Sequence, residues 1–111
     1  MENFKEQAQR VYNFIGTLSK EHPKVAEGFM ALNKGAEADN VLSKKVKELL
    51  ALSIAIAIRC EGCIACHVKA ALEAGATQEE IVETIGVTIS MGGGPSIVYG
   101  EKAYQAMKEM M

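Results

Sequence analysis

Apolar residues recur along most of the chain at the three- and four-residue spacing of an amphipathic helix. Near the N-terminus, behind the candidate N-cap Asn3, these positions are Phe4, Ala8, Val11, Ile15 and Leu18. They predict a first helix that ends near Lys20 or Glu21, because His22 precedes a proline and is disfavoured in the helical conformation. Pro23 suits the first turn of a second helix, which we expect to stop at Gly35. The inward-facing residues of that helix are expected to be Val25, Phe29 and Leu32.

A third helix is predicted from Lys44 to Ile58, after a polar connection over residues 36–42 and a capping serine, Ser43. The run Ile54–Ile58 alternates Ile with Ala, a period of two that is compatible with a β-strand. We favour the helix, because the segment contains no internal glycine or proline and is rich in Ala, Leu, Lys and Glu, which are strong helix formers. Its second half is apolar nearly all round, and we expect it to be buried on most sides.

A fourth helix is predicted to start near Gly62, after a junction over Arg59–Glu61, and to end near Ala74. Gly75 supplies the left-handed residue that commonly follows a helix. The alanines Ala70, Ala71 and Ala74 continue one face of this helix, which indicates close packing against a neighbouring element.

Two further helices complete the pattern. Thr77 and Glu80 form a capping box that opens the fifth, whose inward side chains are expected to be Ile81, Ile85 and Ile89. Glycines 92–94 end it, and Pro95 starts a sixth helix with one apolar stripe made of Ile97, Tyr104, Met107 and Met111. The chain is therefore predicted to be all-α, with about six helices.

Composition and charge narrow the classes of function. The chain has 111 residues, of which 49% are hydrophobic, and we expect one domain over residues 1–111. A lone domain of this size hides only about two-thirds of its unfolded surface, so such an apolar chain is expected to form a homo-oligomer. The net charge is −2 with no basic run, which argues against a nucleic-acid partner.

The longest apolar run, Leu49–Ile58, is too short to cross a bilayer, and no membrane partner is expected. The first ten residues are charged and lack the apolar core of a signal peptide. We therefore expect a cytoplasmic protein. Thiols are kept reduced there, so clustered cysteines favour catalysis or metal binding over a structural disulfide.

The candidate chemistry is concentrated in a cysteine cluster. Cys60, Cys63 and His67 are spaced at i, i+3 and i+7, which places them on one helix face. A thiolate at Cys63, served by the imidazole four residues later, can attack a peroxide or a disulfide. Cys60 is near enough to resolve either intermediate into an intramolecular disulfide. These residues alone are sufficient for a redox cycle.

Glu48 is the one acid that borders the apolar run, and two interpretations stay open. A buried carboxylate would need a partner, whereas an exposed one would simply favour the helix dipole. If the third and fourth helices are straight and antiparallel, Glu48 lies about 18 Å from Cys60 at 1.5 Å per residue. Direct contact with the cysteines would require the helices to fold back on one another or on a neighbouring subunit.

The pattern of Glu48, Cys60, Cys63 and His67 resembles the alkylhydroperoxidase D-like group of the carboxymuconolactone decarboxylase superfamily. The sequence of residues 47–85, KELLALSIAIAIRCEGCIACHVKAALEAGATQEEIVETI, supports this resemblance, which covers about Leu42 to Met107. It implies an all-helical fold that assembles as trimers or hexamers, with thiol peroxidase or disulfide reductase activity.

The resemblance also implies roles and substrates. Cys63 would attack, Cys60 would resolve the intermediate or donate a proton, and His67 with Glu48 would relay protons. The substrate would be a hydroperoxide or a small disulfide, and the electron donor a dithiol such as a lipoyl compound. No cofactor and no metal are expected. The best-characterised members carry an additional histidine where this chain has Gly62, which is expected to weaken the relay. Cys66 is extra, and we expect it to be a small buried residue.

Other interpretations of the same residues remain. Members of the superfamily without cysteines are decarboxylases of a lactone acid, and the cysteines here argue against that activity. Residues 63–67 match the C-x-x-C-H motif of c-type haem attachment, which would leave Cys60 and Glu48 unexplained. Three cysteines and His67 offer four metal ligands, but ligands so close together on one helix do not easily surround an ion. A non-enzymatic helical assembly module is the remaining alternative.

Overall fold

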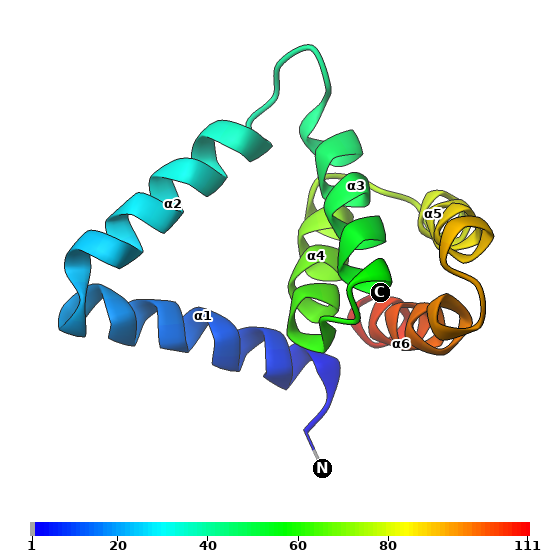
Figure 1. The fold of residues 1–111 in the computed structure, drawn as a ribbon, viewed down its shortest axis with the longest axis horizontal. Coiled ribbons are helices and arrows are strands. Elements are labelled where there is room, and N and C mark those ends of the chain that lie inside the picture. Colours follow the sequence, from blue (N-terminus) through cyan, green and yellow to red (C-terminus); the bar gives the residue numbers. More distant parts are fainter. Residues whose placement is uncertain (1) are drawn as a thin grey trace.

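The computed structural model describes residues 2–111 and places six α-helices in chain order (Figure 1). They are α1 (Phe4–Glu21), α2 (Pro23–Glu37), α3 (Lys44–Ala57), α4 (Glu61–Glu73), α5 (Gln78–Gly92) and α6 (Gly94–Met110). The described residues contain no strand, so the predicted all-α fold is confirmed, including the helical state of the Ile-Ala repeat in α3. None of the described helices is long and apolar enough to span a membrane.

The hydrophobic core lies among α3, α4, α5 and α6. Helices α3 and α4 form a tight helical hairpin, and α5 and α6 pack beside it (Figure 1). The largest fully buried side chains come from all four helices and are Leu52, Ile56, Ile64, Val68, Ile81 and Met107. The α3–α4 hairpin is therefore held rigidly from one side.

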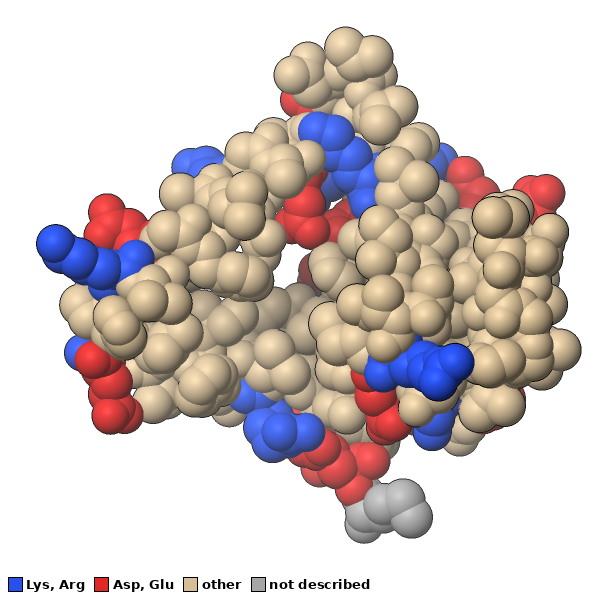
Figure 2. Space-filling model, viewed as in Figure 1, with Lys and Arg blue, Asp and Glu red and all other residues tan. Residues whose placement is uncertain are grey.

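Helices α1 and α2 form an arm, residues 4–37, that extends from this core. Helix α1 packs on α4 and α6, whereas α2 turns back and packs mainly against α1, with a smaller contact to α3 (Figure 1). The molecule is consequently flat, with extents of 40 × 39 × 25 Å. The space between α2 and the α3–α4 hairpin remains open as a hollow (Figure 2).

The predicted helix boundaries are largely confirmed. The predicted N-caps Asn3 and Ser43 and the predicted capping box at Thr77 are all formed, and α1 ends at Glu21; Asn3 also forms a capping box with Glu6, which was not predicted. One boundary was wrong, because α2 continues past Gly35 to Glu37. An isolated glycine only weakens a helix, and the residues that follow Gly35 are good helix formers.

Several residues expected to face inward are exposed instead. In α2, Val25, Phe29 and Leu32 are 49%, 48% and 67% exposed, because the backbone of that helix lies close only to α1 and, over a small contact, to α3. The apolar second half of α3 was expected to be buried on most sides. It buries one face, while Leu50 and Ile54 on its other face and the C-cap residue Ile58 are exposed to solvent.

The predicted stripe of α6 was also wrong. Met107 is buried, but Ile97, Tyr104 and Met111 are exposed. The buried face is made instead by small residues, Ser96, Gly100, Ala103 and Ala106. A Cβ at Gly100 would lie 2.8 Å from a methyl group of Ile85 in α5, so the two helices are too close for a larger side chain.

Candidate active site

A disulfide joins Cys60 and Cys63 at the N-terminus of α4. Cys60 is the N-cap, its Sγ accepts a hydrogen bond of 3.2 Å from the backbone N–H of Cys63, and the sulfurs are 2.09 Å apart. The turn before it is compact: the N–H of Arg59 bonds to Ile56 O and that of Cys60 to Ala55 O. These two backbone hydrogen bonds terminate α3 and fix the position at which α4 starts. The position at a helix N-terminus favours a thiolate when the pair is reduced.

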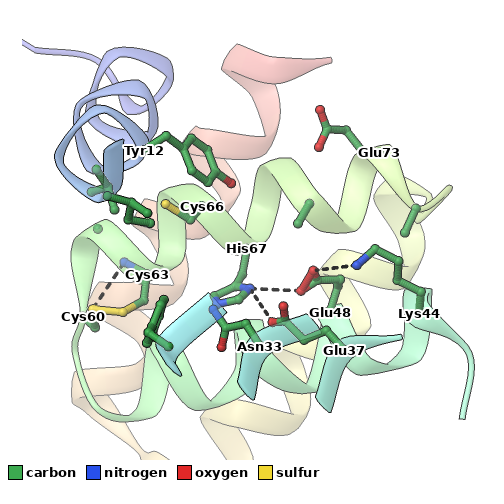
Figure 3. Close-up of a pocket in the computed structure, with 16 residues that line it drawn as sticks. Tyr12, Asn33, Glu37, Lys44, Glu48, Cys60, Cys63, Cys66, His67 and Glu73 are labelled. Carbon is green, nitrogen blue, oxygen red and sulfur yellow. Dashed lines mark hydrogen bonds and ion pairs between the residues drawn. A yellow bond between two sulfur atoms is a disulfide. The ribbon is translucent and has the colours of Figure 1, made fainter. Parts of the chain in front are cut away.

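The disulfide faces a cavity of about 570 Å³ (Figure 3). The hairpin supplies one wall, and the α1–α2 arm supplies the other. Apolar side chains of the arm in this wall are Val11, Ile15 and Phe29, and α4 adds Ala70 and Ala74. The reactive sulfurs therefore face a space large enough for a small organic molecule, with a largely apolar surround.

Glu48 and His67 form a second pair in the same cavity. His67 Nδ1 lies 3.1 Å from Glu48 Oε1, and Glu48 is only 2% exposed. Antiparallel pairing of α3 with α4 brings the first turns of α3 to the middle of α4, not to its cysteine end. The open question about Glu48 is thereby answered: it is a buried carboxylate, and its partner is the imidazole. The four residues singled out in the sequence, Cys60, Cys63, His67 and Glu48, all line one cavity.

Two residues of the arm were missed from the sequence. Glu37 Oε1 lies 4.0 Å from His67 Nδ1, and Asn33 is adjacent in the cavity wall (Figure 3). Phe29, Asn33 and Glu37 recur at i, i+4 and i+8, so they share one face of α2. That periodicity was visible in the sequence, but it gave no indication that this face meets the cysteine helix.

Cys66 is half-buried and lines the cavity, so the expectation of a simple buried residue was wrong. Burial raises the pKa of its thiol, and this effect outweighs a hydrogen bond with Tyr12 and the positive charge of Lys69, both of which lower the pKa. Burial, together with the neighbouring thiol, raises the pKa of Tyr12 to about 12. Both groups are therefore uncharged at neutral pH.

Comparison with known proteins gives consistent matches. The sequence model of the carboxymuconolactone decarboxylase family matches residues 23–106, a region that begins before the resemblance quoted above. An uncharacterized protein of Cupriavidus necator is 36% identical over 89 residues, which are 80% of this chain and 79% of that protein. An uncharacterized protein encoded in the cox locus of Paracoccus denitrificans is 35% identical over 96 residues, 86% of each chain.

Solved structures match over nearly the whole chain. A carboxymuconolactone decarboxylase family protein from Legionella pneumophila, crystallised in its apo form, superposes with a TM-score of 0.93 at 37% identity and covers 96% of both chains. A family protein from Thermotoga maritima, for which a role in the antioxidative response has been suggested, gives a TM-score of 0.84 at 23% identity. It covers 93% of this chain and 88% of its own, and at that identity it supports the fold alone.

Proposed function

Given that the chain belongs to the carboxymuconolactone decarboxylase family, we propose that it is a thiol-dependent oxidoreductase whose Cys60–Cys63 pair cycles between dithiol and disulfide. One observation carries the proposal: the disulfide and the buried His67–Glu48 pair share the wall of one cavity. A decarboxylase of a lactone acid has no need of paired sulfurs. A purely structural module has no need of a disulfide that faces a cavity.

With a hydroperoxide as substrate, the chemistry runs in two steps. The Cys63 thiolate attacks the terminal oxygen, an S–O bond forms, the O–O bond breaks, and the alkoxide takes up a proton and leaves as an alcohol. The Cys60 sulfur then attacks the sulfenic sulfur, an S–S bond forms, and the hydroxyl leaves as water. Two electrons from the dithiol have reduced the hydroperoxide. An external dithiol, for example a lipoyl compound, restores the pair by thiol–disulfide exchange. A small disulfide would be reduced through a mixed disulfide at the same sulfur.

His67 supports these steps as the base that takes the proton of Cys63 and later returns it. Its position four residues after Cys63 puts both side chains on the same side of α4. Glu48 is a positioning residue, because its carboxylate touches the ring nitrogen of His67 and no sulfur. The carboxylate fixes the orientation of the imidazole and stabilises its protonated form.

Substitution of the cysteines tests the proposal. Cys63→Ser is expected to abolish consumption of hydroperoxide. Cys60→Ser is expected to react once and stop, with a sulfenic acid at Cys63 that dimedone traps. Cys66→Ser is the matched control, because this thiol lines the same cavity but lies outside the disulfide. Trapping at Cys60 in the Cys63→Ser protein would show that the roles are reversed, and full turnover in both variants would refute the proposal.

Alkylation of the reduced protein tests the relay. His67→Ala should raise the pH needed for rapid alkylation of Cys63, since the base is removed. Glu48→Gln should shift the profile in the same direction by a smaller amount. The measurement is the rate of carboxymethylation at Cys63 by mass spectrometry between about pH 5 and about pH 10, a range that includes the free-thiol pKa near 8.5 and the upper part of the lowered range. Profiles identical to that of the unsubstituted protein would contradict a relay.

We further propose that the chain assembles as a homo-oligomer, a trimer or a hexamer. The support is the amount of large apolar side chain at the surface of one chain, on α3 with Leu50 and Ile54, and on α5 and α6 with Val87, Met91 and Ile97. Light scattering at micromolar concentration is expected to give a multiple of the 12.0 kDa chain mass. Ile54→Glu on the exposed face of α3 should lower that mass. A monomer mass for the unsubstituted protein would refute assembly.

A further inference from the structure

Three side chains from three different helices converge beside the cavity. They are Glu37 from α2, Glu48 from α3 and His67 from α4 (Figure 3). One carboxylate oxygen from each glutamate and one ring nitrogen of the histidine lie within 4.8 Å of one another. We propose that these three residues bind one divalent transition-metal cation of the Zn²⁺ or Mn²⁺ class. None of the cysteines takes part.

The distances between the three ligand atoms are close to those around a shared cation, and a small movement of the side chains toward one another would complete the site. Zinc bonds to histidine nitrogen and carboxylate oxygen are about 2.0–2.2 Å long, so two ligands of one ion lie roughly 3 to 4.3 Å apart. Glu48 Oε1 is 3.1 Å and Glu37 Oε1 is 4.0 Å from His67 Nδ1, both inside that range. Glu37 and His67 are each 26% exposed, so the site has an open side on which water can complete the coordination.

The carboxylate of Glu48 has no close cationic partner, so a bound cation could pair with it. The Glu48 side chain is 3% exposed, and Oε2 accepts no hydrogen bond from residues 2–111; since no fully buried side-chain oxygen of the described residues lacks a partner, Oε2 is open to the cavity that Glu48 lines. The nearest cation is the ammonium of Lys44 at 4.0 Å, on a side chain that is 50% exposed and able to move away. Two carboxylates therefore face the single ammonium of Lys44, and a divalent cation would balance their remaining negative charge.

The donor set defines the chemical class of the ion. One imidazole and two carboxylates suit the borderline ions Zn²⁺ and Fe²⁺, and also Mn²⁺, which accepts carboxylate ligands together with imidazole, better than Mg²⁺, which favours oxygen ligands alone. The ion would be bound by Nδ1 of His67 and Oε1 of Glu48, the same two atoms that contact one another in this structure. Metal binding and the proposed proton relay are therefore mutually exclusive at these residues.

Calorimetry with the disulfide closed tests the site without reference to the proposed activity. The protein carries Cys66→Ser and is kept oxidised, so that no thiolate is available as a ligand. Titration with Zn²⁺, and separately with Mn²⁺, is expected to give one saturable site per chain, and Mg²⁺ a much weaker response. Binding should also raise the melting temperature, because the ion joins the α1–α2 arm to the hairpin.

Matched variants decide the assignment. Glu37→Gln removes one ligand from a partly exposed position and should weaken binding by about tenfold or more. Lys44→Gln removes the competing ammonium and should strengthen binding. Glu73→Gln is the control, because Glu73 lines the same cavity but its carboxylate pairs with Lys69. The proposal is overturned if neither Zn²⁺ nor Mn²⁺ saturates a site, or if Glu37→Gln binds as tightly as Glu73→Gln.

Discussion

Arg59 holds the backbone conformation on which the position of the disulfide depends, and replacing it by glycine should stabilise the protein. Its φ is +61°, and it is the one non-glycine residue with positive φ among those the structure describes. Positive φ is required because the backbone N–H of Arg59, which follows the C-cap Ile58, must donate to Ile56 O. The same turn of the backbone lets the N–H of Cys60 donate to Ala55 O. The side chain itself is exposed and forms no hydrogen bond or ion pair with the described residues.

The expected gain follows from two opposing terms. A left-handed conformation costs an L-residue with a side chain roughly 1–2 kcal/mol. Glycine removes that cost but adds freedom to the unfolded chain, which costs about 0.4–1 kcal/mol. Arg59→Gly should therefore raise the free energy of unfolding by about 0.5–1 kcal/mol, equivalent to a few degrees in melting temperature.

Urea denaturation at fixed protein concentration measures this gain, and two controls isolate its cause. Arg59→Ala removes the side chain but keeps the strain, and should leave the free energy of unfolding nearly unchanged. Gly75 occupies the corresponding position after α4, with φ of +95° and no atom within 4 Å of a Cβ added there. Gly75→Ala should therefore destabilise through backbone strain alone. If Arg59→Gly destabilises the protein, or if Arg59→Ala stabilises it equally, the strain argument is wrong.

Further predictions concern the burial of Cys66 and the packing of Gly100. Because burial raises the pKa of Cys66, its thiol is protonated at neutral pH. Iodoacetamide should therefore alkylate Cys66 slowly in the oxidised protein, and the pH at which the rate is half-maximal should lie above that of an ordinary cysteine. Alkylation as fast as that of a cysteine in a short unstructured peptide would contradict this prediction. Tyr12→Phe removes a hydrogen bond that lowers this pKa, so it should slow the reaction further. Gly100→Ala should destabilise by about 1–3 kcal/mol, measured by thermal unfolding, because its Cβ would lie 2.8 Å from Ile85. Gly86→Ala has no atom within 4 Å of the new Cβ, so it should stabilise by about 0.5–1 kcal/mol; equal effects at the two glycines would reject the packing explanation.

The features that could be predicted from sequence are those set by short-range rules. The N-cap at Asn3 and the capping box at Thr77 depend on residues within three positions of one another, and the role of Gly75 depends on its own backbone. The pairing of Cys60 with Cys63 belongs to the same class, since a separation of three residues at a helix start is enough to bring the sulfurs together. These predictions needed no knowledge of where the helices lie.

Burial was harder to predict, because an apolar residue was assumed to face the core of its own chain. In α6 that assumption selected Ile97 and Tyr104, whereas the helix packs through Ser96 and Gly100. Close approach of two helices requires small residues, and the hydrophobic pattern does not identify them. Phe29 is a further case of the same error: it was expected to face the core, but it is half-exposed because its helix borders the cavity.

The two walls of the cavity differ in how their residues are held. The hairpin is packed against α5 and α6, so the disulfide and the His67–Glu48 pair are fixed by the core. The arm is joined to the hairpin mainly through α1, and α2 meets it only at one end. The groups proposed to do the chemistry therefore lie on the rigid wall and close together in sequence, between residues 48 and 67. Phe29 and Glu37 line the opposite wall of the cavity and lie on the arm, where substitutions can change what the cavity accepts without moving the disulfide.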